Sequence, residues 1–348
     1  MRRVLAFVFV AACTPSVANG PTVVPPPGPA ATVTCGGGRE LVAHFYDVGQ
    51  GLSVLVDLPD GRHVLVDAGD EKSRAGCGDV CARASAHLSD VLARDLHGAP
   101  IDLVWITHQH SDHVGGIAEV LARFPARAYV DNGHDLSRAE IKRARSAAEK
   151  TGAHVITIDP EHPTAAELGP SDGALTMSAI VPRAFPSRCK SDQNDCSIML
   201  RIDYCSSSIL FTGDAETDLE KVTQLRAPVT LLQVGHHGSN TSSSEAFLSQ
   251  ARPRYAVISS GKPREGLNST YCHPRASTVR RLTQHIDGGL GGDAGSVVAY
   301  DRDDHCDERD EASWVPIRTS SAIYSTARDG DVVLSTKGDG TFTRVNPR

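Results

Sequence analysis

The stretch His108-Gln109-His110-Ser111-Asp112-His113 follows directly after the apolar run 101–106. Three imidazoles and one carboxylate within six positions place neutral and anionic donors around one small volume. Imidazole suits zinc and most divalent first-row metals, whereas carboxylate oxygen suits harder ions such as manganese. The stretch therefore predicts a transition-metal site on the turn between a buried strand and a helix.

The spacing within this loop indicates how it could serve two ions. His108 and His110 would face one ion, and Asp112 and His113 would turn toward the other. Two glycines, at 115 and 116, begin the helix expected at 115–124, and their lack of side chains would let the backbone approach the site closely. A solvated polar turn is the alternative, but a loop that follows a buried strand and precedes a helix favours metal binding.

Four further motifs occur at or near strand ends. They are Phe45-Tyr46-Asp47-Val48-Gly49-Gln50-Gly51, Leu65-Val66-Asp67-Ala68-Gly69-Asp70, Ile209-Leu210-Phe211-Thr212-Gly213-Asp214 and Val234-Gly235-His236-His237-Gly238-Ser239. With the hexapeptide they resemble the metallo-β-lactamase superfamily, and more narrowly the hydrolase domain of ComEC-type competence proteins. The likeness covers residues 41–282 and returns at Arg328-Asp329-Gly330-Asp331. It includes no membrane channel, so a free-standing domain is expected.

This resemblance implies an α/β fold, a four-layer αββα sandwich, for the hydrolase domain at 40–348. The apolar segments 41–46, 53–58 and 63–66, broken by Pro59-Asp60-Gly61, predict antiparallel strands. Further strands are predicted at 101–106, 128–130, 198–202, 208–212, 229–234, 322–326, 332–336 and 341–345, and helices at 81–96, 115–124, 137–151 and 216–225. Residues 286–318, glycine-rich and then acidic, are expected to form an exposed insertion.

The length and the cysteine content of the chain limit the classes of protein to which it can belong. With 348 residues, 40% of them hydrophobic, the chain can bury a core without metal or disulfides. It nonetheless has nine cysteines, and a lipidated Cys13 would leave an even number for pairing in an oxidising compartment. Cys77 with Cys81 and Cys189 with Cys196 are the simplest local pairs. A structural zinc held by Cys77, Cys81 and another pair is the alternative.

The first residues predict export. Arg2 and Arg3 precede the apolar stretch 4–12, which is too short to cross a bilayer and is typical of a secretory signal. Val10-Ala11-Ala12-Cys13 resembles a bacterial lipobox. We therefore expect a signal peptide at 1–12, a lipid anchor on Cys13 with a proline- and glycine-rich tether at 13–39, and a lipoprotein on the periplasmic or outer surface. Ordinary secretion without lipid is the alternative.

The resemblance also implies a ligand set. Asp214 would be shared between two ions, because each carboxylate oxygen can serve a different cation; a helix N-cap is the alternative role. His236 and His237 end the next strand, and we favour His236 as the ligand and His237 as its neighbour, with the reverse order left open. The expected ligands of two divalent ions, zinc or manganese, are His108, His110, Asp112, His113, Asp214 and His236.

Two aspartates and one asparagine are expected around these ligands. Asp67 stands where the superfamily keeps an aspartate beside the histidine loop, and it would orient the loop or an imidazole by hydrogen bonds. Asp47 could act similarly or be a turn residue. Many relatives have a metal-binding histidine where this chain has Gln193-Asn194-Asp195-Cys196-Ser197, and ComEC-like domains tend to have asparagine there. One metal position is therefore poorer in nitrogen, which leaves manganese open, and Asn194 is a candidate substrate-binding residue.

Hydrolysis is the chemistry that such a site would perform. A bound cation can lower the pKa of water to about 7, and a metal pair can clamp the attacking and leaving oxygens. Asp112, His237 and His273 are the candidate catalytic residues. Lys262, Arg264 and Arg275 stand on segments that resemble the ComEC-like loops closing over the site, and they could bind phosphate oxygens. A solvated basic loop is the alternative.

A phosphodiester, DNA among the candidates, is the leading substrate of the expected phosphodiesterase or nuclease. The formal net charge of −7 opposes a polyanion unless the charge is segregated, so small phosphodiesters, including phosphocholine-type esters, stay open. A β-lactamase or lactonase is a second hypothesis, and a noncatalytic surface-tethered binding protein is a third. The sequence indicates no protein partner; the expected partners are the substrate and, through the lipid anchor, the membrane.

Overall fold

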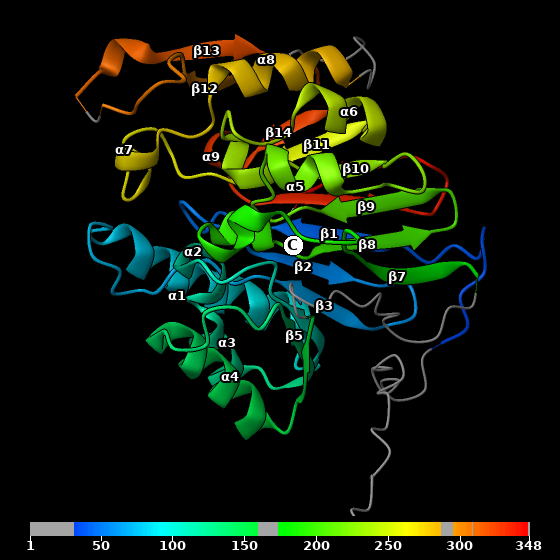
Figure 1. Cartoon of the computed structure of the whole chain (residues 1–348). Helices are drawn as coiled ribbons and strands as arrows, with labels where there is room; N and C mark the ends of the chain where they lie inside the picture. The colour runs from blue at the N-terminus through cyan, green and yellow to red at the C-terminus, as the bar shows by residue number, and fades with distance from the viewer. Residues whose placement is uncertain (1–30, 159–172, 287–294, 308, 347–348) are drawn as a thin grey trace, which may run out of the picture.

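The computed structural model describes residues 31–158, 173–286, 295–307 and 309–346. Two large β-sheets lie against each other in the middle of the molecule, and helices cover their outer faces (Figure 1). The expected signal peptide, Cys13 and most of the expected tether lie outside the described residues. Within the described part, no helix is both long and apolar enough to cross a membrane.

The first sheet has eight strands in the order β16-β15-β1-β2-β3-β4-β5-β6. Its strands are β1 (Leu41–Phe45), β2 (Val54–Asp57), β3 (His63–Val66), β4 (Ile101–Trp105), β5 (Ala126–Asp131), β6 (His154–Thr157), β15 (Val332–Thr336) and β16 (Thr343–Val345). From β3 to β6 neighbouring strands are parallel, and the other pairs are antiparallel. The helices of this half are α1 (Val80–Leu96), α2 (Ser111–Val114), α3 (Ile117–Arg123) and α4 (Ala139–Thr151).

The second sheet has six strands in the order β14-β11-β10-β9-β8-β7. Its strands are β7 (Leu175–Ile180), β8 (Met199–Tyr204), β9 (Ser207–Phe211), β10 (Leu231–Gln233), β11 (Tyr255–Ile258) and β14 (Ile323–Ser325). From β9 to β14 the neighbours are parallel. The helical segments of this half are η1 (Ser187–Lys190), η2 (Gln193–Cys196), α5 (Thr217–Val222), η3 (Gly235–Gly238), α6 (Glu245–Ala251), α7 (Asn268–Tyr271), α8 (Ala276–His285), η4 (Glu311–Ser313) and α9 (Thr326–Asp329).

Three apolar layers separate these elements and confirm the expected αββα fold. The central layer lies between the sheets and contains Phe45, Trp105 and Phe211. A second layer packs the helices of the first half onto their sheet, and a third packs α6 and α8 onto the other sheet. Strand β4 is apolar almost throughout because a parallel strand covered on both faces has no solvent side.

The histidine loop differs from its sequence-based prediction in one respect. We expected a turn followed by a single helix at 115–124, whereas Asp112 and His113 already lie on the short helix α2 and the chain then continues into α3. Gly116 separates the two helices, and a Cβ atom there would collide with the carbonyl oxygen of Ala68. The absence of a side chain thus lets α2 lie directly against the end of β3.

Residues 286–318 differ from the exposed insertion that we expected. The described part forms a two-stranded sheet of β12 (Ser296–Tyr300) and β13 (Trp314–Arg318) that belongs to the apolar layer around α8. Val297 and Ala299 are buried because alternate side chains of β12 point toward the helix, and Tyr300 at the end of the strand is buried as well. The acidic residues that follow β12 remain on the surface.

Eight cysteines form four disulfide bonds: Cys35–Cys205, Cys77–Cys81, Cys189–Cys196 and Cys272–Cys306. Both local pairs were predicted, and the structural-zinc alternative is wrong because the sulfurs of Cys77 and Cys81 are bonded to each other. The bond from Cys35 reaches the end of β8, and Val33 is buried. The end of the expected tether at 13–39 therefore packs on the domain from about residue 31 onward.

Candidate metal centre

The carboxyl ends of parallel strands bring the candidate ligands together. Asp67 follows β3 and His108 follows shortly after β4 in the first sheet; Asp214 follows β9 and His237 follows β10 in the second. Side chains that leave parallel strands at the same edge converge there. The two halves of the sandwich therefore both contribute to one centre, which no single segment of the chain could form.

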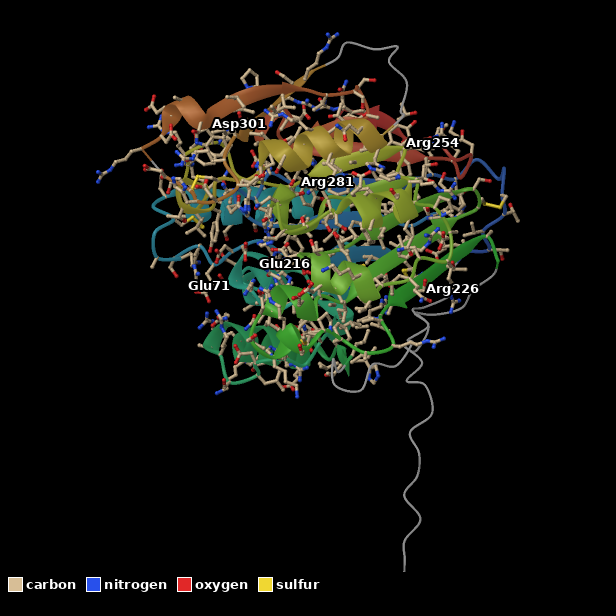
Figure 2. All side chains as sticks on the ribbon, turned by 45° about the horizontal axis from the view of Figure 1, so that its top comes forward. Glu71, Glu216, Arg226, Arg254, Arg281 and Asp301 are labelled. Atoms are coloured by element: carbon tan, nitrogen blue, oxygen red, sulfur yellow. A yellow bond between two sulfur atoms is a disulfide. The ribbon has the colours of Figure 1, made fainter. Side chains whose placement is uncertain are left out.

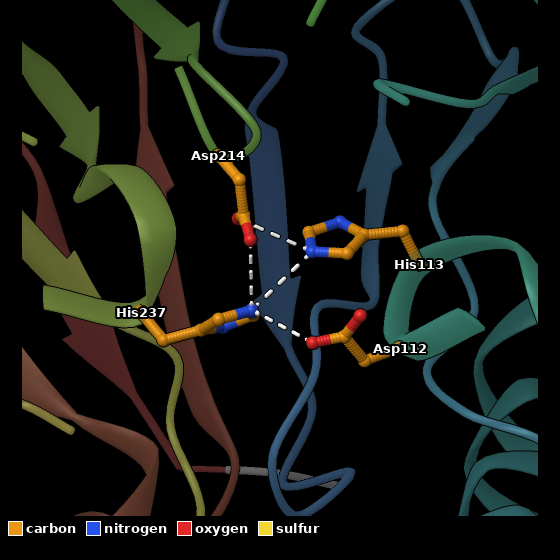
Figure 3. Close-up of side chains that lie close together, drawn as sticks. All are labelled: Asp112, His113, Asp214 and His237. Carbon is orange, nitrogen blue, oxygen red and sulfur yellow. Dashed lines mark hydrogen bonds and ion pairs between the residues drawn. The ribbon is translucent and has the colours of Figure 1, made fainter. Parts of the chain in front are cut away.

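The first ligand group consists of Asp112, His113, Asp214 and His237 (Figure 3). The Nε2 atom of His113 lies 3.1 Å from Oδ1 of Asp214 and 3.3 Å from Nε2 of His237. That second Nε2 atom also lies 3.3 Å from Oδ2 of Asp214 and 3.3 Å from Oδ2 of Asp112. Two carboxylates and two imidazoles thus surround one buried point.

The second group contains His108, His110 and, again, Asp214. Nε2 of His108 lies 3.1 Å from Nδ1 of His110 and 3.9 Å from Oδ2 of Asp214. The structure therefore places Asp214 in both groups, and the hexapeptide contributes to both in the way that its spacing indicated. His108 is wholly buried, so its ring cannot be a solvated turn residue.

The hydrogen bonds of the imidazoles decide which ring atoms carry lone pairs. Nδ1 of His113 lies 2.7 Å from Oδ2 of Asp67, and Nδ1 of His237 lies 2.8 Å from the carbonyl oxygen of Ser259. Neither oxygen can donate, so both Nδ1 atoms carry a proton, and in a neutral ring each Nε2 atom presents a lone pair to the centre. The two Nε2 atoms lie 3.3 Å apart. A metal ion between them would bind both lone pairs.

The first group fits a divalent metal ion in size as well as in chemistry. A tetrahedral ion with ligand bonds of about 2.0–2.1 Å has ligand atoms separated by about 3.3–3.4 Å. The nearest separations in this group are 3.1 and 3.3 Å. Moreover, Oδ1 of Asp214 is buried and accepts no hydrogen bond from any described residue. The residues present therefore fit a bound metal, and divalent metal binding is typical of the donor set.

The pKa values of Asp214 and His237 show that positive charge is stabilised in the centre. Burial disfavours the charge of Asp214, but the neighbouring imidazoles hold its pKa well below the usual range. Burial also opposes protonation of His237, yet Asp214 and Asp112 raise its pKa to about 10. Burial and His113 lower the pKa of His108 well below its ordinary value. The carboxylates are thus anionic and attract a cation into the site.

Asp67 and Thr107 orient the histidine loop. Asp67 is wholly buried, and besides the His113 ring it accepts hydrogen bonds from the backbone N–H of Thr107 at 2.9 Å and from its hydroxyl at 2.7 Å. Thr107 also contacts Nδ1 of His108 at 3.2 Å. Asp67 thus lies where the resemblance placed it. No motif drew attention to Thr107; its position directly before the hexapeptide is the only sequence signal.

The loop after β9 depends on a glycine. Gly213 has a φ of 57°, a left-handed conformation that glycine adopts without steric cost. A Cβ atom there would lie 2.6 Å from Cβ of Thr107. Gly213 thus allows the end of β9, which carries Asp214, to pass directly against the end of β4.

His236 and His237 occupy different positions although they are adjacent. We favoured His236 as the ligand, but the structure places His237 in the first group. Nε2 of His236 lies 3.8 Å from Oδ2 of Asp214, and Nδ1 of His236 lies 3.1 Å from Oε1 of Glu216. Figure 2 labels Glu216 near the middle of the molecule. Both histidines have left-handed backbones, with φ of 47° and 51°. Such residues persist where the surrounding structure holds them, often at functional sites.

Asn194 and His273 border the centre. Nδ2 of Asn194 lies 3.4 Å from Nε2 of His236, on the loop where many relatives have a histidine. The ring of His273 lies 5.3 Å from that of His236, measured between centroids, and its Nδ1 lies 3.5 Å from Nε2 of Gln50. The structure therefore brings both candidate residues to the side of the centre where His236 lies.

The remaining candidates lie farther out. Arg275 donates to the carbonyl oxygens of Arg302, His305 and Tyr271, so its guanidinium holds loops together where we expected substrate binding. Arg264 is paired with Glu311 on the surface, 2.6 Å apart.

Lys262 and Asp47 line a separate cavity of about 420 Å³. Asp47 accepts from the backbone N–H of Gly49, as in a turn, and its own N–H donates to Asp331. The structure thus places neither Lys262 nor Asp47 among the ligand groups, and Asp47 matches the turn role that the sequence left open.

Comparisons with known proteins agree with this architecture. Residues 46–177 match the family model described as the metallo-beta-lactamase superfamily. Recombination protein 2 of Haemophilus influenzae is 30% identical over 62% of this chain and 24% of its own length. ComE operon protein 3 of Bacillus subtilis is 26% identical over 74% of this chain and 32% of its own. The chain thus spans about a quarter to a third of these relatives.

Among solved structures, a long form RNase Z from yeast aligns with 11% identity, a TM-score of 0.40, and coverage of 64% of this chain and 38% of that one. The matched family region contains Asp67 and the whole histidine loop. The competence-protein relatives match the likeness that the strand-end motifs indicated. The chain belongs to the metallo-β-lactamase superfamily and is similar to ComEC-type competence proteins.

Proposed function

We propose that this superfamily hydrolase is a metal-dependent phosphodiesterase or nuclease that acts outside the cytoplasm. The observation that carries the proposal is the pair of ligand groups that share Asp214. Two adjoining cation positions with a common carboxylate suit a reaction in which both the attacking and the leaving oxygen carry negative charge. In-line displacement at a phosphodiester is such a reaction.

The residues of the chain have separate tasks in this proposal. His108, His110, Asp112, His113, Asp214 and His237 would hold two divalent ions, zinc or manganese, with His236 at their border. When bound, these ions would supply positive charge to the phosphoryl oxygens and lower the pKa of a nucleophilic water. Asp67 and the Ser259 carbonyl keep the ring protons on Nδ1, which leaves Nε2 free. Asn194 and His273 would contact the substrate from the side of the centre where His236 lies.

The four disulfides support the proposed location. Such bonds form in extracellular and envelope compartments and are rare in the reducing cytosol. They indicate an extracellular or envelope protein. The lipid anchor on Cys13 is part of the proposal, and mass spectrometry of the N-terminal peptide from the native host would detect it.

The decisive experiment combines metal analysis with turnover. The purified chain, loaded with zinc or manganese, would be assayed with bis-p-nitrophenyl phosphate, linear and circular DNA, nitrocefin and a lactone. We expect phosphodiester cleavage that a chelator abolishes and excess metal restores. Asp214→Ala should lose at least about 10³-fold in kcat/KM, because a charged transition state loses stabilisation of several kcal/mol.

Asp57→Asn is the matched control. Asp57 is also a partly buried aspartate between two imidazoles, but it lies outside both ligand groups, so its substitution should preserve metal content and turnover. Efficient cleavage of nitrocefin or the lactone without phosphodiester cleavage would overturn the proposal. Absence of bound metal and of every activity would favour a noncatalytic binding protein instead.

A further inference from the structure

An exposed aromatic ring stands at the rim of the metal centre. Tyr271 ends α7, and its side chain is 40% exposed. Among the large apolar side chains exposed in the described part of the chain, it is the only aromatic one. Trp105, Tyr46 and Tyr129, by contrast, are fully buried. The exposed position of Tyr271 therefore needs an explanation that core packing does not provide.

A short series of rings connects Tyr271 to the centre. Its ring lies nearly parallel to that of His273, with centroids 6.1 Å apart and planes at 29°. The His273 ring lies 5.3 Å from that of His236 and 6.4 Å from that of His237. Burial and the negative charge of Asp112 raise the pKa of the Tyr271 hydroxyl, whereas Arg74 lowers it.

The backbone around Tyr271 is held from three sides. The next residue, Cys272, is bonded to Cys306. Asn268, at the start of α7, is wholly buried; its amide donates to the carbonyl oxygen of His273 at 2.6 Å and accepts from the N–H of that residue at 2.7 Å. The carbonyl oxygen of Tyr271 accepts from Arg275 at 3.2 Å. A ring on such a support loses little conformational entropy when a flat ligand covers it.

We propose that Tyr271 is the nucleobase-stacking residue of this hydrolase, and that it selects phosphodiesters with an unpaired base beside the reacting phosphate. The inference rests on the proposed phosphodiesterase function and names its substrate class. Stacking uses the flat face of the base, which every nucleobase has, so it tolerates sequence variation. It also needs no broad basic groove, and a chain with a net charge of −7 offers a polyanion little general attraction.

The test compares two esters with the same leaving group: the p-nitrophenyl ester of thymidine monophosphate and methyl p-nitrophenyl phosphate, which lacks a base. Metal-loaded Tyr271→Ala should lose roughly 5- to 150-fold in kcat/KM on the thymidine ester, since one stacked base contributes that much. Its kcat/KM on the methyl ester should be unchanged. Tyr271→Phe and Tyr271→Trp should keep the preference for the thymidine ester, because both retain a flat ring.

Val298→Ala is the control, because Val298 is equally exposed at 41% but lies on β12 in the small two-stranded sheet. It should change neither rate. An equal loss on both esters in Tyr271→Ala, or a lowered melting temperature with reduced metal content, would assign Tyr271 a structural role and overturn the inference. An unchanged ratio of the two rates would overturn it as well. Failure of the wild-type protein to cleave either ester would instead reject the phosphodiesterase function itself.

Discussion

Two clusters of histidine and aspartate in the described part of the chain contain the same residue types but differ in how their side chains meet. One is the candidate metal centre at the strand ends. The other lies on β1, β2, β3 and α1, where His44 and His63 contact the two oxygens of Asp57 at 3.0 and 2.8 Å and His44 also lies 3.5 Å from Asp95. In this second cluster each short contact joins a ring nitrogen to an oxygen, so a proton can occupy it.

In the candidate metal centre, short contacts join nitrogen to oxygen and, in addition, nitrogen to nitrogen. Nε2 of His113 faces Nε2 of His237, and Nε2 of His108 faces Nδ1 of His110. Their outer hydrogen bonds hold the Nδ1 protons of His113 and His237, which leaves the Nε2 atoms directed at the centre. The comparison shows that a histidine–aspartate cluster indicates a metal site when its lone pairs converge, and that proximity of the residues alone is insufficient.

The largest effect should come from replacing His237, and the comparison with replacement of the adjacent His236 tests which of them is the ligand. Nε2 of His237 has three atoms of the first ligand group within 3.3 Å, whereas Nε2 of His236 lies 3.8 Å from Asp214. His237→Ala should therefore remove one ion per chain and reduce kcat/KM by at least about 10²-fold, and His236→Ala should cost less. Metal content by mass spectrometry and steady-state rates measure both. A larger loss in His236→Ala would reverse the ligand assignment.

An intermediate effect should follow from changing the hydrogen bond behind a ligand. Asp67→Asn can present an amide N–H to Nδ1 of His113, which would move the ring proton to Nε2 and occupy the lone pair. We expect metal affinity to fall roughly 10- to 100-fold, as is typical when such a partner is lost. Titration with a competing chelator measures it. The control is Asp95→Asn, because Asp95 is also a buried aspartate but lies near His44. This variant should keep the metal affinity of the wild type. Equal losses of metal affinity in both variants would contradict this role of Asp67.

The smallest effect concerns stability and its pH dependence. Burial opposes the charge of Asp57, but hydrogen bonds from His44 and His63 lower its pKa to about 2, and Asp57 raises the pKa of His63. The contribution of Asp57 is present above pH of about 4 and lost as pH falls toward 2. That of His63 is full below pH of about 6.5 and lost as pH rises through the higher folded value.

Asp57→Asn should therefore cost about 1–2 kcal/mol of unfolding free energy, most strongly between about pH 4 and 6.5. Urea unfolding at several pH values, with metal content as the control, measures this cost. A loss that is largest at pH 8 would contradict the assigned ion pairs. A loss of metal in this variant would contradict the distinction between the two clusters.

Sequence patterns predicted most of the elements around the site. The alternation of apolar residues predicted β1, and a continuous apolar run predicted β4, because these patterns reflect which faces of a strand are buried. The short spacing between cysteines predicted the two local disulfides. Strands β6, β7 and β11 were missed. Strands β6 and β7 lie at the sheet edges, whereas β11 lies inside its sheet and is only four residues long. The insertion was misjudged because acidic flanks concealed the three buried residues of β12.

The sequence by itself determined that imidazoles and carboxylates would be concentrated in one place, because six consecutive residues cannot separate whatever the fold. It also determined their order along the chain and the fold class. Only the tertiary structure decided that His237 lies in a candidate ligand group and that Thr107 supports the histidine loop. Those outcomes depend on backbone direction in a tight turn and on partners distant in sequence, and neither is encoded in the local pattern of residues.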